Sequence, residues 1–468
     1  LNTIAIRLVP ALFGVATVGL VLTLRRHLGA IATLSAAFLL AVSPGAVYLS
    51  RYFIHETLFV FFTLGIVVAA LKYFEDASPV YLILTAVSTA LLFATKETAI
   101  ISAGVLVIAL LLTYLYRRLR TRTTNVRGPG RKKKRRSDSG GELRTFVERV
   151  GGPTRLTIWI AVALAVFVVV NVLFYSSFFT NYPKGVSDAL KTFEFWTKTG
   201  KEAHVHPFVT YIWWLLLQES PLLFFGALGA LLVVVQPTKP LALFSALWAF
   251  GLIAAYSLIA YKTPWLALNF IVPLALTGGV AIDWLYQELG NWEMDKRKRA
   301  GALAVVLVFA LGIVPGLIRA FDQKALHWKT FIPGYQTIDL NFINYDNDNR
   351  YYVYVYAHTR REALKLVDEI DRIAERTHQH SAAGITIVSA DYWPLPWYLR
   401  DYTRVGYYGR ITPSNEPIII ASESQAAEVQ ATYGDRYQQV PSGFNPAGSF
   451  PLRPGVDLLL YTRRELVP

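Results

Sequence analysis

Runs of about 20 apolar residues, separated by short polar stretches, fill the chain as far as about residue 320. A helix needs about 20 apolar residues to cross the hydrocarbon core of a bilayer. Beyond residue 320 the apolar residues fall instead into short alternating stretches. We therefore expect a polytopic α-helical membrane domain over 1–320 and a separate domain over 321–468.

Ten spans are expected in the first domain. They lie near residues 4–24, 31–49, 57–74, 79–95, 98–116, 156–178, 221–236, 241–260, 264–285 and 300–319. The segment 207–219 is rich in Tyr and Trp but short and amphipathic, which predicts either an interfacial helix or the beginning of a long seventh span. Because Leu1 is not an initiator and the chain opens almost inside an apolar run, we also expect the N-terminus to be incomplete.

The basic residues indicate how the spans are oriented. The formal net charge is +14, yet the part from Phe321 onward has 15 basic and 17 acidic residues, so the membrane domain carries the surplus. Eleven Lys or Arg residues and no acidic residue lie between Arg117 and Arg136. Cytoplasmic loops of membrane proteins are enriched in Lys and Arg, which predicts that the loop 117–150 is cytoplasmic. A surplus confined to loops argues against a nucleic-acid partner.

The same count places the loop 179–206 and the whole of 321–468 outside the cytoplasm, in a multi-pass protein of the cell (plasma) membrane. Membrane lipids are then partners of the chain, and the basic loop either fixes topology alone or also binds anionic headgroups.

Ionisable side chains occur at the external ends of several expected spans, where their burial is costly. They are Arg51, His55 and Glu56, then Lys96 and Glu97, and finally Tyr261 with Lys262. Basic groups beside a carboxylate suit a lipid-phosphate substrate, because the cations neutralise the phosphate and the carboxylate takes a proton from an acceptor hydroxyl. The alternative is that these are snorkelling or mutually paired helix-end charges.

Metal and cofactor sites are not expected. The chain has no cysteine, which excludes thiol and Cys-zinc chemistry. His204 and His206 flank Val205 in an external loop, but no carboxylate completes a ligand motif there.

The segment 321–468 is predicted to be an α/β domain. Strands are expected over 350–357, 385–389, 417–421 and 456–461, and a helix over 360–377. No phosphate loop or catalytic triad spacing is evident there. Between Asp391 and Tyr402, aromatic residues, prolines and charges follow an expected strand, which suits either stacking on sugar rings or packing onto a membrane surface.

Short motifs give the chain a resemblance to GT-C glycosyltransferases of the protein mannosyltransferase and aminoarabinose transferase type. The motifs are Arg7 to Gly14, Ser43-Pro44 and Ser50 to Glu56. Further motifs resemble the subgroup of flippase-activity-associated membrane proteins: Ala94 to Ala99, Tyr261 to Trp265 and Trp393 to Tyr402. Their order along nearly the whole chain supports the resemblance.

The resemblance implies a polyprenyl-phosphate-linked sugar as donor, a lipid, glycan or protein as acceptor, and an active site at the external membrane face. Arg51, Lys96 and Lys262 would contact the donor phosphate, and Glu56 would be the catalytic acidic residue. His55, Glu97 and Tyr261 are further candidates for substrate binding. The family also has an acidic pair in a first external loop, which would precede Leu1.

Two other functions remain open at this point. The subgroup's name suggests a non-catalytic component that assists translocation of lipid-linked oligosaccharides. A secondary transporter is disfavoured, since the sequence lacks paired repeats with broken helices.

Overall fold

The computed structural model describes residues 3–125, 139–198, 205–236, 239–290, 352–356 and 358–467, together with 295–297, 299–301, 303–304, 337 and 340. The chain divides into two compact units, Leu1–Ile343 and Asn344–Pro468. The domain boundary expected at 320/321 lies outside the described residues, as does most of the expected span 300–319.

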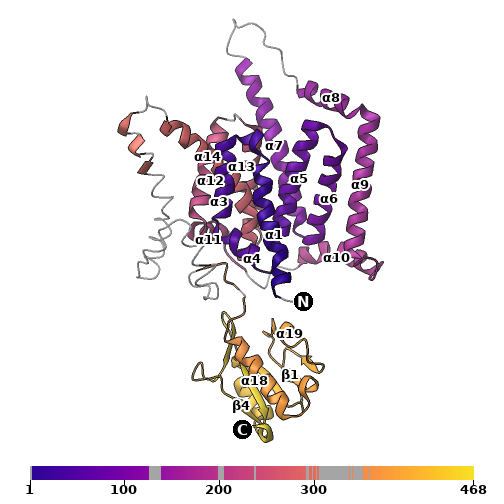
Figure 1. Cartoon of the computed structure of the whole chain (residues 1–468), viewed down its shortest axis with the longest axis vertical. Coiled ribbons are helices and arrows are strands. Elements are labelled where there is room, and N and C mark those ends of the chain that lie inside the picture. The colour runs from indigo at the N-terminus through magenta and orange to yellow at the C-terminus, as the bar shows by residue number, and fades with distance from the viewer. Residues whose placement is uncertain are drawn as a thin grey trace. The chain divides into compact units, whose positions relative to one another are not determined.

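The first unit is built of α-helices (Figure 1). Several of them begin with Pro in the first turn, where its fixed φ suits the helix and its missing N–H costs nothing. At the start of α4, the Ser43 side chain also accepts a hydrogen bond from the N–H of Ala46. The helices are α1 Thr3–Leu22, α2 Arg25–Leu28, α3 Ala30–Ala41, α4 Pro44–Arg51, α5 Glu56–Asp76, α6 Pro79–Thr95, α7 Ala99–Asn125, α8 Ser139–Val150, α9 Pro153–Tyr175, α10 Lys184–Lys198, α11 Thr210–Gln218, α12 Ser220–Val235, α13 Pro240–Leu258, the 3-10 helix η1 Pro264–Ala267 and α14 Leu268–Gly290.

Six of the described helical segments are long and apolar enough to cross a membrane: α1, α5, α7, α9, α13 and η1 with α14. The number rises to eight if the bent pairs α3–α4 and α11–α12 each count as one span, and α6 is a shorter apolar helix of 17 residues. The polytopic helical membrane fold is therefore confirmed. The expected number of ten spans is not, partly because the tenth falls outside the described residues.

A buried carboxylate joins the two bent helix pairs. The chain bends by 56° between α3 and α4 and by 115° between α11 and α12. Glu219, at the second bend, accepts hydrogen bonds through Oε1 from the Ser43 hydroxyl (2.9 Å) and the Gly45 N–H (2.8 Å). The carboxyl oxygen thereby satisfies an N–H group of the first turn of α4, which has no partner within the helix. The 115° bend also means that α11 does not continue α12 as one straight span.

Two glycines allow α14 to approach α3 and α12 closely. A Cβ added at Gly279 would lie 2.0 Å from the carbonyl oxygen of Ala32, and one added at Gly229 would lie 1.9 Å from that of Thr277. Small residues at helix interfaces in membrane proteins let backbones come into contact in this way. The close contacts hold α14 against α3 and α12, and the first residues of α14 line one cavity of the helical unit.

Replacing Gly279 or Gly229 with Ala is expected to destabilise the protein by about 1–3 kcal/mol, because the helices must separate to admit the methyl group. Unfolding of the detergent-solubilised protein measures the effect. Gly19→Ala in α1 is the matched control, since an added Cβ there meets no atom of the described residues within 4 Å. Equal stability of all three variants would contradict the close backbone contacts.

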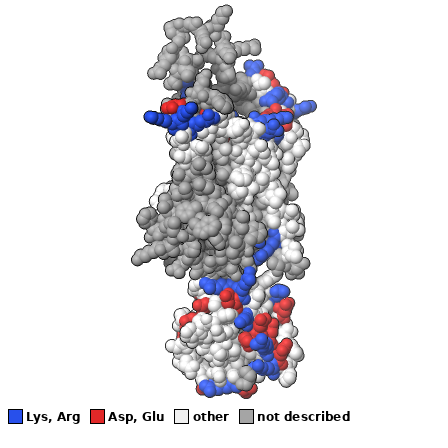
Figure 2. Space-filling model, turned by 60° about the vertical axis from the view of Figure 1, so that its left-hand side comes forward, with Lys and Arg blue, Asp and Glu red and all other residues white. Residues whose placement is uncertain are grey.

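Segments that the charge pattern assigned to one side of the membrane meet at one end of the first unit, the basic end. His27 pairs with Glu75 (Nε2 to Oε1, 3.2 Å), and Arg149 of α8 donates to the Glu75 carbonyl (2.7 Å). Arg120 of α7 donates to the carbonyl of Val235 (2.8 Å). Figure 2 shows Lys and Arg side chains gathered at this end, next to surface without charges.

The second unit is a mixed sheet packed between helices. Its elements are α18 Ala363–Arg376, η4 His380–Ala382, β1 Ile385–Ile387, α19 Leu395–Tyr398, β2 Val405–Tyr407, β3 Ile418–Ser422, η5 Glu423–Gln425, α20 Ala426–Tyr433, β4 Tyr437–Val440, β5 Phe450–Arg453, β6 Val456–Arg463 and η6 Arg464–Leu466. The strand order is β2-β1-β3-β6-β4, with β5 paired to β6. β1 is parallel to β2 and β3, whereas β6 is antiparallel to β3, β4 and β5.

Both faces of this sheet are buried. Ile418 and Ile420 share a core with α18, while Ile419 and Ala421 share a core with α20. Successive residues of β3 face opposite sides of the sheet, and the residues on both sides are apolar. This pattern is expected for a strand that is covered on both faces. The expected α/β domain is confirmed, and the expected helix and three of the expected strands correspond to α18, β1, β3 and β6.

The strand expected over 350–357 is wrong for residues 352–356, the part of it that the structure describes. The N–H of Val355 donates to the carbonyl of Tyr352 (3.0 Å), which closes a turn. Tyr352, Tyr354 and Val355 are all buried. Their aromatic and β-branched composition therefore reflects burial in a turn, since packing decides where such residues go more strongly than strand propensity does.

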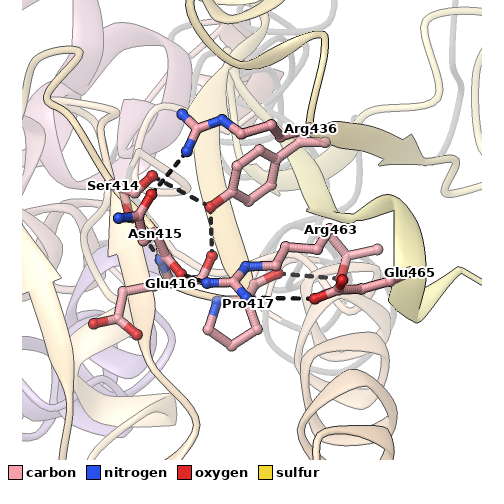
Figure 3. Close-up of polar contacts among 9 residues, drawn as sticks. Ser414, Asn415, Glu416, Pro417, Arg436, Arg463 and Glu465 are labelled. Atoms are coloured by element: carbon pink, nitrogen blue, oxygen red, sulfur yellow. Dashed lines mark hydrogen bonds and ion pairs between the residues drawn. The ribbon is translucent and has the colours of Figure 1, made fainter.

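The loop 414–417, which leads into β3, is held by side chains from neighbouring segments (Figure 3). Arg436 donates to the side-chain oxygen of Asn415 (2.7 Å), and the Tyr437 hydroxyl donates to the carbonyl of Glu416 (2.7 Å). Arg463 donates to the backbone carbonyl of Asn415. The polar side chains at the amino end of β3 thus serve to fix this loop.

Candidate functional site

Five of the seven candidate residues come together in one cavity of about 280 Å³, the polar cavity. Glu56 is the first residue of α5, Lys96 directly follows the last residue of α6, and Tyr261 lies between α13 and η1. The residues lining it are Ile54, His55, Glu56, Thr95, Lys96, Glu97, Thr98, Tyr261, Trp265 and Leu266. Three chain segments that are distant in sequence therefore build one polar site at the end of the helices opposite the basic end.

The centre of the polar cavity is an ion pair between Lys96 and Glu56. Lys96 Nζ lies 2.6 Å from Glu56 Oε1, and the side chains are 13% and 1% exposed. The second carboxylate oxygen, Oε2, is buried and has no hydrogen-bond partner among the described residues. A buried acceptor without a partner costs free energy unless a ligand or water supplies a donor. Glu56 thus has one oxygen engaged with Lys96 and one available to a hydroxyl group.

His55 and Tyr261 add two ionisable groups whose pKa values are shifted toward the neutral form. His55 Nε2 lies 3.7 Å from Glu56 Oε1. Desolvation at the cavity wall lowers the pKa of His55, and the nearby Glu56 carboxylate opposes this less strongly. Desolvation raises the pKa of Tyr261, and the Glu56 and Glu97 carboxylates add to the effect. Both shifts favour the uncharged forms of the side chains beside Glu56, while Lys96 forms the ion pair with it.

Lys262 lies outside the residues that line the polar cavity. It is 1% exposed, and its ammonium donates to the carbonyls of Ile259 (2.5 Å) and His206 (3.2 Å). The N–H of His206 in turn donates to the carbonyl of Ala260 (3.1 Å). These contacts hold the segment 205–206 against the turn that carries Tyr261, so the position of Lys262 indicates a structural role.

Arg51 lines a second cavity, of about 300 Å³, which we call the apolar cavity. Its walls come from α1, α3, α4, α5 and α14. The lining residues are Ala11, Gly14, Val15, Thr17, Val18, Leu40, Ala41, Ala46, Val47, Ser50, Arg51, Thr57, Val60, Leu268 and Val272. Both cavities are lined by the segment 50–57 and by the region where η1 passes into α14.

Some of the lining residues were not anticipated from the sequence. Thr98 and Trp265 line the polar cavity, and each follows a candidate residue by no more than four positions. Glu219 was overlooked as well, although an acidic residue directly before the apolar run of α12 is a signal for a buried charge. It acts on α4, which ends at Arg51.

The structure gives no new reason to assign a metal. Within the described ranges, no group of three or more His, Cys, Asp or Glu side chains is placed to hold an ion. His204 lies outside those ranges, and the ring of His206 packs edge-on against Trp214 at 5.5 Å.

Comparison with known proteins gives one family match and a fold. Residues 2–128 match the family of dolichyl-phosphate-mannose-protein mannosyltransferases. This segment contains Arg51, Glu56 and Lys96. No curated protein sequence matches the chain.

Two crystal structures of ArnT from Cupriavidus metallidurans have the same fold. One has undecaprenyl phosphate bound and the other is in the apo state. Each aligns with a TM-score of 0.60 and 15% sequence identity over 99% of this chain, and over 85% and 84% of the respective ArnT chain. The expected GT-C-like fold is thus confirmed, and the flippase-associated subgroup is not.

Proposed function

We propose that this chain, which has the GT-C fold and a mannosyltransferase family match in its first 128 residues, transfers a sugar from a polyprenyl-phosphate-linked donor. The family is named for a lipid-phosphate sugar donor, and one of the ArnT structures holds undecaprenyl phosphate. The observation that carries the proposal is the Lys96–Glu56 pair in a polar cavity whose walls share the segment 50–57 with an apolar cavity.

The two cavities suit the two halves of a polyprenyl phosphate. The apolar cavity offers walls of Ala, Val and Leu side chains from five helices, which suits an isoprenoid chain. Arg51 belongs to the same cavity, and a guanidinium is well suited to bind a phosphate. Lys96 supplies a second cation in the polar cavity, where its ammonium has three N–H donors to divide between Glu56 and a phosphate.

Glu56 is the residue we assign to proton transfer. Its buried Oε2 accepts a hydrogen bond from the acceptor hydroxyl and takes the proton as the oxygen attacks the sugar. Lys96 compensates the negative charge that develops on the leaving phosphate. Tyr261, held neutral, is a donor to the same site, and His55 and Glu97 contribute polar groups to the sugar-binding wall.

The basic end of the helices is assigned to the cytoplasm by the excess of Lys and Arg in its loops. The polar cavity then lies at the external face of the plasma membrane, and residues 344–468 form an extracytoplasmic domain. The acceptor is a lipid, glycan or protein on that side.

The test uses the protein reconstituted in lipid nanodiscs, with undecaprenyl phosphate as the binding probe and native mass spectrometry as the readout. Transfer is followed in proteoliposomes made with native lipids and acceptors, as release of undecaprenyl phosphate from an undecaprenyl-phosphate-linked, sugar-labelled donor. Binding together with transfer is the expected result. Binding with translocation of the labelled lipid but no transfer would replace the proposal with the flippase-associated role, and absence of binding would overturn both.

A further inference from the structure

Exposed aromatic side chains gather at one edge of the sheet in the second unit. Trp393 follows β1 and is 62% exposed, Tyr408 follows β2 and is 53% exposed, and Trp397 of α19 is 39% exposed. β1 and β2 are parallel, so the loops that follow them leave the sheet at the same edge. We call Trp393, Trp397 and Tyr408, with the polar residues Asp391 and Arg400, the aromatic edge.

Backbone contacts hold the two loops of the aromatic edge side by side. The N–H of Tyr408 donates to the carbonyl of Ile387 (2.9 Å), and a Cβ added at Gly409 would lie 3.7 Å from Cα of Ala390. Exposed apolar side chains that gather in one patch mark interaction sites more often than singly exposed ones do. Here they project from loops fixed to adjacent strands.

Arg453 and Arg400 fix the side chains further. Arg453 forms an ion pair with Asp391 (2.7 Å) and donates to the carbonyl of Trp393 (3.0 Å). The Arg400 guanidinium lies 4.7 Å from the centre of the Trp397 ring and donates to the Trp397 carbonyl (2.7 Å). Such preorganisation lowers the entropic cost of binding a ligand. The residues of the aromatic edge are therefore held in place before a ligand binds.

The carboxyl ends of parallel strands are where α/β sheets bind ligands, especially where neighbouring connections diverge. In this sheet that position lies between β1 and β3. The chain leaves β1 toward its neighbour β2, whereas β3 is the neighbour of β1 on the opposite side. Gln425, after β3, donates to the carbonyl of Val388, after β1 (3.1 Å). At the amino end of β3, by contrast, the polar side chains are engaged in holding the loop 414–417.

The chemistry of the aromatic edge favours a carbohydrate over a lipid surface. A sugar ring has an apolar face that stacks on Trp or Tyr and a rim of hydroxyls that need acceptors and donors. Asp391 is 61% exposed in its side chain, and Glu423 is a second exposed carboxylate at the end of β3. Burial of these carboxylates in the hydrocarbon of a bilayer would be costly.

We propose that the aromatic edge is a glycan-binding site, with Trp393 as the stacking platform and Asp391 as an acceptor for sugar hydroxyls. The site is formed by residues of the second unit, whereas the Lys96–Glu56 pair belongs to the first unit. Its existence does not depend on whether the chain transfers sugars.

The test measures binding of soluble oligosaccharides of mannose, glucose, galactose and N-acetylglucosamine to the full chain in nanodiscs. Because the chain has no cysteine, Asp401→Cys provides a single labelling position beside Arg400 for an environment-sensitive fluorophore. We expect saturable fluorescence changes with at least one sugar type. Trp393→Ala is expected to weaken that binding at least tenfold, while Trp393→Phe retains most of it.

Asp391→Asn is expected to weaken binding, and Asp435→Asn is its matched control. Asp435 is also exposed and also lies near an arginine (3.7 Å from Arg436), but it precedes β4 at the other edge of the sheet. Absence of binding by every oligosaccharide would overturn the proposal. Quenching of the fluorophore by spin-labelled lipids would also overturn the proposal, if Trp393→Ala abolished that quenching. This result would identify the aromatic edge as a membrane contact.

Discussion

Replacing Lys96 with Met is expected to lower both the affinity for undecaprenyl phosphate and the rate of sugar transfer by about 10²- to 10³-fold, the effect of removing one preorganised charge-stabilising group. Lys96 is 13% exposed, so bulk water does not replace the lost ammonium efficiently. Met conserves the length of the side chain and removes only the charge and its donors. Native mass spectrometry and the donor-release assay measure the two quantities.

Glu56→Gln separates catalysis from binding. Loss of a general base lowers transfer by about 10²- to 10⁴-fold, whereas affinity for undecaprenyl phosphate is expected to stay constant or rise, because Lys96 is freed for the phosphate. Lys191→Met is the control, since Lys191 is 71% exposed and pairs with Asp188 at 3.7 Å in α10. Full transfer activity in both Lys96→Met and Glu56→Gln would contradict the assignment of this site.

The second large effect concerns stability. Lys96→Met alone is expected to cost about 3–5 kcal/mol, because it leaves the buried Glu56 carboxylate without its cation. Glu56 is 1% exposed and its Oε2 already lacks a partner among the described residues, so the charge has little other compensation. Adding Glu56→Gln removes the unpaired charge and is expected to recover most of the loss. Reversible unfolding in mixed micelles measures each variant.

This double-variant cycle distinguishes a substrate site from a structural ion pair. The double variant is expected to be nearly as stable as the parent protein yet still unable to bind undecaprenyl phosphate. Lys191→Met is expected to change stability by less than about 1 kcal/mol, as is usual for exposed pairs. If the double variant regained lipid binding along with stability, the pair would be structural only.

The helical unit was largely predictable because a bilayer imposes a length and a composition on each span. Expected spans such as 57–74 and 241–260 correspond to α5 and α13 within a few residues. The bends between α3 and α4 and between α11 and α12 were harder to predict from the sequence. Ser43-Pro44 and Ser220-Pro221 look like ordinary helix starts, and only the contact from Glu219 to Gly45 shows that the two breaks stabilise one another.

Residue type alone did not indicate which candidate residues share a cavity. Lys262 resembles Lys96 in sequence, as a lysine beside a polar residue between two spans, yet its ammonium is turned to the carbonyls of Ile259 and His206. In the second unit, the Tyr and Val residues of 352–356 have strand composition but form a buried turn.

The sequence by itself determined that the chain crosses a membrane repeatedly, which loops are basic, and which ionisable residues stand at the opposite helix ends. These properties follow from hydropathy and charge, which can be read from residues that are close together in the sequence. The tertiary structure decided that Glu56 pairs with Lys96 across 40 residues and that Arg51 joins the apolar cavity. Such contacts depend on how helices pack at glycines such as Gly229 and Gly279, and a linear pattern does not contain the distance between two helices.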